Sequence, residues 1–169
     1  MTGLGTQAAL LQSVGIGITN LIFTFLGLWL IDRLGRRTLL IIGSLGYITA
    51  LGLTSWAFAG GHLTLVPAYI FGFMAAHAIG QGAVIWVFIS EIFPNRQRAF
   101  GQAFGSFTHW FFAAVITLAF PILAEAMKPQ FIFGIFCGMM ILQLVWVIFF
   151  VPETKGISLE KMEGRIMSH

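Results

Sequence analysis

Five long runs without a charged side chain constrain this chain more than any other feature. The runs cover residues 10–31, 39–59, 66–89, 100–123 and 131–151, and none contains Asp, Glu, Lys or Arg. About 20 consecutive apolar residues are needed to cross the hydrocarbon layer of a bilayer, so each run is long enough for a transmembrane helix. A soluble bundle would need polar faces on its outer helices, and these runs are apolar nearly all round. The sequence therefore predicts an all-α integral membrane protein.

Composition and loop lengths agree with this class. Only 9% of the 169 residues are charged, whereas a soluble domain carries roughly a quarter. We expect five transmembrane helices at about residues 8–31, 38–59, 65–92, 99–124 and 131–151, with a tail at residues 152–169. The connections are short, so consecutive helices should pack as antiparallel neighbours. The first nine residues contain no basic side chain, which argues against a signal peptide.

The basic residues predict how the chain sits in the membrane. Eight of the nine lie in the segment 32–37, the segment 93–98 and the tail: Arg33, Arg36, Arg37, Arg96, Arg98, Lys155, Lys161 and Arg165. Only Lys128 falls on the other side. Because cytoplasmic loops are enriched in Lys and Arg, we expect a multi-pass protein of the cell membrane with its N-terminus outside and its C-terminus in the cytoplasm. The net charge of +3 then reflects topology and the anionic inner leaflet, and no nucleic-acid partner is expected.

Enzyme chemistry has no support in the sequence. It contains no phosphate-binding loop, no spacing typical of metal ligands and no nucleophile beside a base. We therefore predict neither an enzyme nor a cofactor.

Three charged motifs separate the predicted helices on the cytoplasmic side. They are "DRLGRR" (residues 32–37), "SEIFPNRQR" (90–98) and "PETKG" (152–156). Together, in this order and spacing, they resemble the sugar porter family of the major facilitator superfamily, whose members have twelve helices in two halves of six. The chain resembles helices eight to twelve. The resemblance thus implies that residues 1–169 form a partial C-terminal transmembrane domain, with the first half and the seventh helix as missing partners.

The resemblance also implies a role for the charged motifs. In the family, such residues form an inner network of salt bridges that helps to hold the outward-facing state and breaks when the inside opens. Charge-assisted pairs at a partly dry helix end can be worth a few kcal/mol, against about 0 to 1 kcal/mol for exposed pairs. The alternative is a set of independent, solvated loop charges. The implied gate residues are Asp32, Arg33, Arg36, Arg37, Glu91, Arg98 and Glu153.

Polar side chains within the apolar runs are candidates for a substrate path, because at bilayer depth they need a partner or a wet cavity. They are Gln12, Asn20, His77, Gln81 and His109. Asn20 lies in "GITNLIFTF", which is similar to the family's eighth helix, where an Asn binds sugar hydroxyls. An amide suits this task because, like a hydroxyl, it both donates and accepts hydrogen bonds.

Two further segments carry the remaining site residues that the resemblance implies. "GQGAVIWVFISEIFP" is similar to the tenth helix, in which a tryptophan, here Trp86, lies beside the sugar and Gly82 would let the substrate approach the backbone. Ala83 stands where many members have a proline. "FGSFTHWFFA" is similar to the eleventh helix, with His109 in place of an amide and Trp110 after it. His77 stands where relatives often have an aromatic residue that faces the site.

The sequence thus predicts transport of a monosaccharide, a pentose or a hexose, by alternating access and in symport with protons, with this chain as an incomplete portion. One alternative is a truncated membrane fragment without activity of its own. A remote alternative is a haem-binding membrane module with His77 and His109 as ligands. For each histidine, a simple hydrogen bond between helices is the competing interpretation.

Overall fold

The computed structural model describes residues 6–156, which form helices and short connections. The elements are α1 (Thr6–Leu34), α2 (Arg36–Gly60), the 3-10 turn η1 (Leu63–Leu65), α3 (Val66–His77), the π-helical turn η2 (Ala78–Gly82), α4 (Ala83–Ile92), α5 (Arg98–Ala126) and α6 (Pro129–Phe150). Elements η1 to α4 are continuous, so the described chain has five apolar spans: 10–34, 36–60, 63–92, 98–126 and 129–150. The predicted all-α fold with five long apolar helices is confirmed.

Glycine and proline set the ends of several helices. Gly61 follows α2 in the left-handed conformation (φ 75°), and His62 N–H then donates to the carbonyl of Ala57 over 2.9 Å. This arrangement pairs one of the carbonyls that the last turn of a helix would otherwise leave without a partner. Pro129 stands at the start of α6, where its missing N–H costs no helical hydrogen bond.

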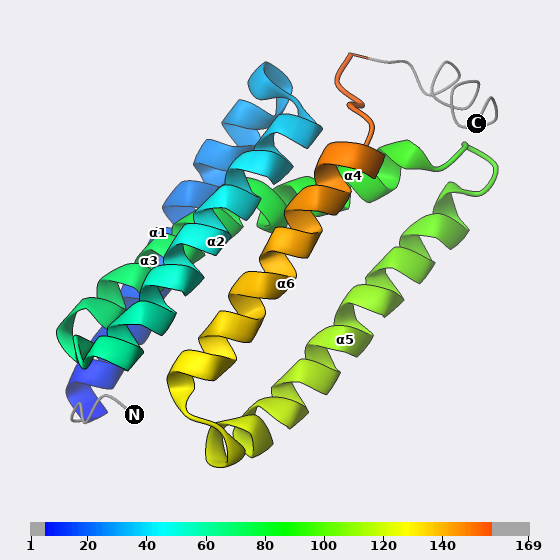
Figure 1. The fold of residues 1–169 in the computed structure, drawn as a ribbon. Helices are drawn as coiled ribbons and strands as arrows, with labels where there is room; N and C mark the ends of the chain where they lie inside the picture. The colour runs from blue at the N-terminus through cyan, green and yellow to red at the C-terminus, as the bar shows by residue number, and fades with distance from the viewer. Residues whose placement is uncertain (1–5, 157–169) are drawn as a thin grey trace.

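Helix α2 is the centre of the bundle and contacts α1, α3 and α6 (Figure 1). Its buried side chains include Leu39, Leu40 and Tyr47. The main buried hydrophobic cluster joins α1, α2, α4 and α6 with the segment after α6, through Ile31, Leu39, Leu40, Val84, Phe88, Val147 and Val151. The core therefore lies at the end of the bundle that carries the charged motifs.

Helix α5 stands apart from the other helices over most of its length (Figure 1). It contacts α4 and α6. Gly101 is the one residue of α5 that is buried in the described structure. Large apolar side chains such as Phe100, which is 84% exposed, and Leu118, 76% exposed, have no cover in residues 6–156.

The third span contains a π-helical turn, η2, that the sequence did not indicate. The backbone of η2 packs against α1 and α2, and glycine residues lie at both contacts. A Cβ at Gly80 would lie 2.6 Å from Gly43 Cα of α2, and a Cβ at Gly27 of α1 would lie 3.0 Å from the carbonyl oxygen of Ala78. The approach at Gly80 is too close for a side chain and the one at Gly27 is tighter than most Cβ contacts, so these glycines permit direct backbone packing against the turn. Single π-turns of this kind often occur at functional sites.

Candidate functional site

A cluster of charged side chains joins the ends of α1, α2 and α4 and the segment after α6. We call Asp32, Arg36, Glu91, Glu153 and Thr154 the charged cluster. Arg36 makes a two-pronged contact with Glu91: its Nη2 donates to Oε1 over 2.8 Å and its Nε donates to Oε2 over 3.0 Å. The side chains are 12% and 23% exposed, respectively. A bidentate arginine-carboxylate pair that is largely withdrawn from water is stronger than an exposed one.

The other partner of Arg36 is much more exposed. Arg36 Nη1 donates to Asp32 Oδ1 over 3.0 Å, and the side chain of Asp32 is 80% exposed. Solvent screens this pair, so we expect it to contribute about 0 to 1 kcal/mol. Arg36 and Glu91 therefore form the principal ion pair of the cluster.

Glu153 binds the start of α2 through backbone groups. Its Oε1 accepts from Arg36 N–H over 2.9 Å and its Oε2 from Arg37 N–H over 3.1 Å. A carboxylate here satisfies donors that the first turn of a helix leaves free and complements the helix dipole. Gly35 makes this possible, because it adopts φ 93° and because a Cβ at this position would collide with the Glu153 carboxylate.

Thr154 is a cluster member that was not among the predicted gate residues. Its hydroxyl donates to Glu91 Oε2 over 2.6 Å, and the residue is 4% exposed. The only signal in the sequence was its place in the motif "PETKG". A short hydroxyl inside a charged motif does not by itself indicate which carboxylate it contacts.

Three of the predicted gate residues, Arg33, Arg37 and Arg98, form no ion pair within residues 6–156. Arg33 lies over the ring of Trp29, with 3.8 Å from Cζ to the ring centroid. Arg37 Nη2 donates to the carbonyl of Ile148 over 2.5 Å. Arg98 has buried Nε and Nη2 atoms without a hydrogen-bond partner in residues 6–156. The ion pairs of the described chain are those of Arg36 with Glu91 and with Asp32.

The predicted substrate residues lie in two small groups. Trp86 of α4 and His109 of α5 contact each other edge to face, with ring centroids 5.1 Å apart, and His109 contacts Trp110 at 5.4 Å. Gly82 lies beside His77, since a Cβ there would be 3.3 Å from Nε2 and Cδ2 of the imidazole. Gly82 ends η2 and Trp86 lies four residues later in α4, so the two groups lie about one helical turn apart along the same span.

Two other polar side chains are not part of these groups. Asn20 is exposed on α1, and its side chain makes no hydrogen bond within the described residues. Gln81 turns toward α2, where its Nε2 donates to Ser44 Oγ over 3.0 Å. Within residues 6–156, no group of three or more His, Cys, Asp or Glu residues could hold a metal ion.

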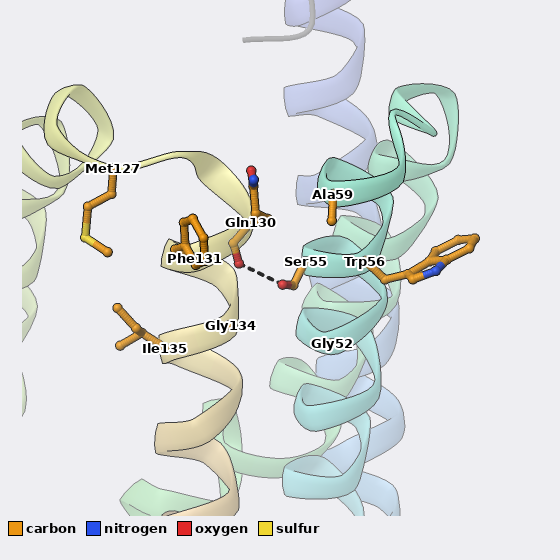
Figure 2. Close-up of a pocket in the computed structure, with 9 residues that line it drawn as sticks. All are labelled: Gly52, Ser55, Trp56, Ala59, Met127, Gln130, Phe131, Gly134 and Ile135. Atoms are coloured by element: carbon orange, nitrogen blue, oxygen red, sulfur yellow. Dashed lines mark hydrogen bonds between the residues drawn. The ribbon is translucent and has the colours of Figure 1, made fainter.

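An apolar pocket of about 630 Å³ opens between α2, α6 and the segment that joins α5 to α6 (Figure 2). The Ser55 hydroxyl in this pocket already donates to the carbonyl of Gln130 over 2.7 Å. None of the predicted substrate residues lines it. The lining residues are Gly52, Ser55, Trp56, Ala59, Met127, Gln130, Phe131, Gly134 and Ile135.

Comparison with known proteins identifies the family. The sequence profile described as "Sugar (and other) transporter" matches residues 1–165. The chain is 37% identical to the major myo-inositol transporter IolT of Bacillus subtilis, covering 99% of this chain and 37% of that protein. It is 32% identical to the glucose transporter GlcP of Staphylococcus epidermidis, covering 95% and 37%.

Solved structures give the same result. The inward open xylose transporter XylE from E. coli matches with a TM-score of 0.85 and 33% identity, over 94% of this chain and 36% of that one. A double Trp mutant of XylE matches with a TM-score of 0.89, 32% identity and coverage of 96% and 36%. The fold is thus that of membrane transporters of the major facilitator superfamily, not of an enzyme. The chain belongs to the sugar (and other) transporter family. It spans a little more than a third of the length of these relatives.

Proposed function

We propose that residues 1–169 form part of a monosaccharide transporter that works by alternating access. The observation that carries this proposal is the similarity, along nearly the whole chain, to the sugar transporter family. In the proposed arrangement, further helices of the same transporter complete the bundle, and the charged motifs face the cytoplasm with the N-terminus outside the cell membrane. Alternating access requires two halves that rock around a central site. The exposed apolar side chains of α5 are consistent with cover by such helices.

The charged cluster is proposed as the inner gate. Its contacts link the ends of three helices with the segment after α6, so they favour one arrangement of these ends. A few paired charges with partial solvent access can bias a two-state equilibrium by a few kcal/mol without locking it. We include Arg33, Arg37 and Arg98 in the gate as residues that change their contacts when the helix ends separate.

The sugar site is proposed at Asn20, His77, Gly82, Trp86, His109 and Trp110. The contact between Trp86 and His109 brings an aromatic face next to a polar ring. An aromatic face can pack on the C–H face of a pyranose, while histidine and asparagine bind its hydroxyls. The proposed substrates are pentoses or hexoses, together with protons, since one structural relative is described as a proton:xylose symporter.

Transport in proteoliposomes tests the proposal. A transporter that contains these residues and the helices that complete it should take up labelled xylose or glucose saturably, and an inward proton gradient should accelerate uptake. Empty liposomes are the control. Absence of saturable uptake for pentoses, hexoses and inositols would refute the proposed function, whereas uptake that is indifferent to the gradient would refute symport alone.

A further inference from the structure

Tyr47 of α2 contacts His77 of α3 inside the bundle. Its hydroxyl oxygen lies 2.5 Å from His77 Nδ1. Tyr47 is 5% exposed, and its ring packs against Phe73 with ring centroids 4.8 Å apart. Tyr47 belongs to neither the charged cluster nor the proposed sugar site. A buried hydroxyl aimed at a histidine ring nitrogen therefore needs an explanation of its own.

The direction of this hydrogen bond follows from the partners that are available. No acceptor for the Tyr47 hydroxyl other than His77 Nδ1 occurs within residues 6–156. If Nδ1 carried a proton and donated it, the buried Tyr47 O–H would be left without an acceptor, which costs about 1 to 3 kcal/mol. If Tyr47 donates instead, Nδ1 accepts and both groups are satisfied. The second arrangement is favoured.

A neutral imidazole carries one proton, so an accepting Nδ1 leaves the proton on Nε2. The Nε2 edge of His77 lies next to Gly82, where the missing side chain leaves it uncovered. No protein acceptor for Nε2 is found among the described residues, and His77 is half-buried. The free N–H therefore lies next to Gly82, a residue of the proposed sugar site.

We propose that Tyr47 is a positioning residue that fixes His77 in its Nε2–H form, so that His77 presents a hydrogen-bond donor to a hydroxyl oxygen of the substrate. The choice of a sugar hydroxyl as the acceptor rests on the proposed function, but the assignment of the tautomer does not. A fixed donor discriminates between ligands by the position of an oxygen, which a stacked aromatic ring in the same place cannot do.

Nitrogen-15 NMR of the 169-residue chain in lipid nanodiscs tests the tautomer directly. At pH 8 an unperturbed imidazole, with a pKa of about 6.5, is neutral, so the two ring nitrogens give distinct signals. The variant His77→Gln assigns the His77 signals by their loss. We expect the proton on Nε2. In Tyr47→Phe, which keeps the ring beside Phe73, the Nδ1–H form should increase several-fold. The control is Tyr69→Phe, which removes the chain's other tyrosine hydroxyl and should leave His77 unchanged.

A proton on Nδ1 in the parent chain would overturn the proposal, and so would an unchanged tautomer in Tyr47→Phe. If Tyr47→Phe does not fold, the position of the His77 proton in the parent chain still tests the proposal. In the complete transporter, Tyr47→Phe should raise KM for the sugar several-fold with little change in maximal rate. An unchanged KM with the expected tautomer would refute the sugar as acceptor. Absence of transport by the parent would refute the proposed function, while the NMR result would still decide the tautomer.

Discussion

At the scale of single residues, Arg36 determines the geometry of the charged cluster. It is the common partner of Glu91 and Asp32, and its backbone N–H binds Glu153. The two ion pairs differ mainly in exposure, because Glu91 is 23% exposed and Asp32 is 80% exposed. This difference provides a matched comparison of a sheltered and a solvated partner of the same arginine.

We expect Glu91→Ala to destabilise the chain by about 2 kcal/mol, between the values for exposed and fully buried pairs, since it leaves the Arg36 guanidinium with the exposed Asp32 as its one ion-pair partner. Asp32→Ala should cost about 0 to 1 kcal/mol. Thermal unfolding in detergent measures both. In the complete transporter, Glu91→Ala should favour inward-facing states and reduce transport more than surface expression. If Glu91→Ala and Asp32→Ala had equal effects on stability and transport, Glu91 would not be the more important partner of Arg36.

The proposed sugar site makes a prediction of its own. Trp86→Ala removes an apolar face and Asn20→Ala removes hydrogen bonds worth about 0.5 to 1.5 kcal/mol each, which corresponds to a loss of affinity of about 2- to 10-fold per bond. Both should weaken sugar binding by the complete transporter. Trp56→Ala, outside the proposed site, serves as the control. If both variants bound the sugar with the parental affinity, Trp86 and Asn20 would not belong to the sugar site.

At the scale of elements, glycines allow close packing at two places: between η2 and α2, and between the start of α2 and Glu153. Gly80 and Gly43 let the backbones of η2 and α2 meet, whereas a methyl group added at Gly72, earlier in the same span, would have nothing within 4 Å. Packing therefore requires a glycine at position 80, whereas position 72 of the same span has room for a side chain.

We expect Gly80→Ala to lower the melting temperature because the added methyl group would lie 2.6 Å from Gly43 Cα, a backbone atom that cannot move alone. Gly72→Ala should be neutral or stabilising by up to about 1 kcal/mol, since alanine favours a helix over glycine. Thermal unfolding of the two variants side by side checks this. A Gly80→Ala variant as stable as Gly72→Ala would mean that the close packing of η2 is not required.

The turn between α1 and α2 gives a second comparison at this scale. Gly35 and Gly61 both have positive φ, 93° and 75°, but only Gly35 also lies against a carboxylate, that of Glu153. Gly61→Ala should cost about 1 to 2 kcal/mol for the backbone alone. Gly35→Ala should cost more, because it also displaces Glu153 from the start of α2. Similar melting temperatures for the two variants would show that Glu153 does not stabilise this helix.

At the scale of the whole molecule, the bundle is unevenly covered. Helix α2 is well packed, while α5 has one buried residue in the described structure. We expect the 169-residue chain alone to give no saturable sugar uptake in liposomes, since the proposed site needs helices on its other side. Saturable uptake above empty liposomes would show that the chain is sufficient.

The orientation is also a property of the whole molecule. In the sequence, eight of nine basic residues fall in segments predicted to be cytoplasmic, so a C-terminal tag should be protected in intact cells and become accessible after permeabilisation. A tag that reagents reach from outside intact cells would reverse the proposed topology.

The class of protein and the number of spans could be predicted from the sequence alone. Uncharged runs of this length leave the backbone no alternative in lipid but to satisfy its hydrogen bonds within helices. The charged motifs likewise identified the family, because they keep their order and spacing along the chain. These are properties of local composition and of position, which a single sequence contains in full.

Which of these residues meet is a result of the tertiary structure. Arg36 and Arg37 are neighbours of the same type, yet the side chain of Arg36 reaches Glu91 and that of Arg37 reaches Ile148. The orientation of α2 relative to α4 and α6 determines which partner each arginine reaches. The packing of α2 against α3 and η2 likewise places Tyr47 against His77 and Gly43 against Gly80, contacts between spans that periodicity cannot indicate. Pairing between helices depends on their relative rotation and depth, and in uniformly apolar helices the sequence carries little signal for either.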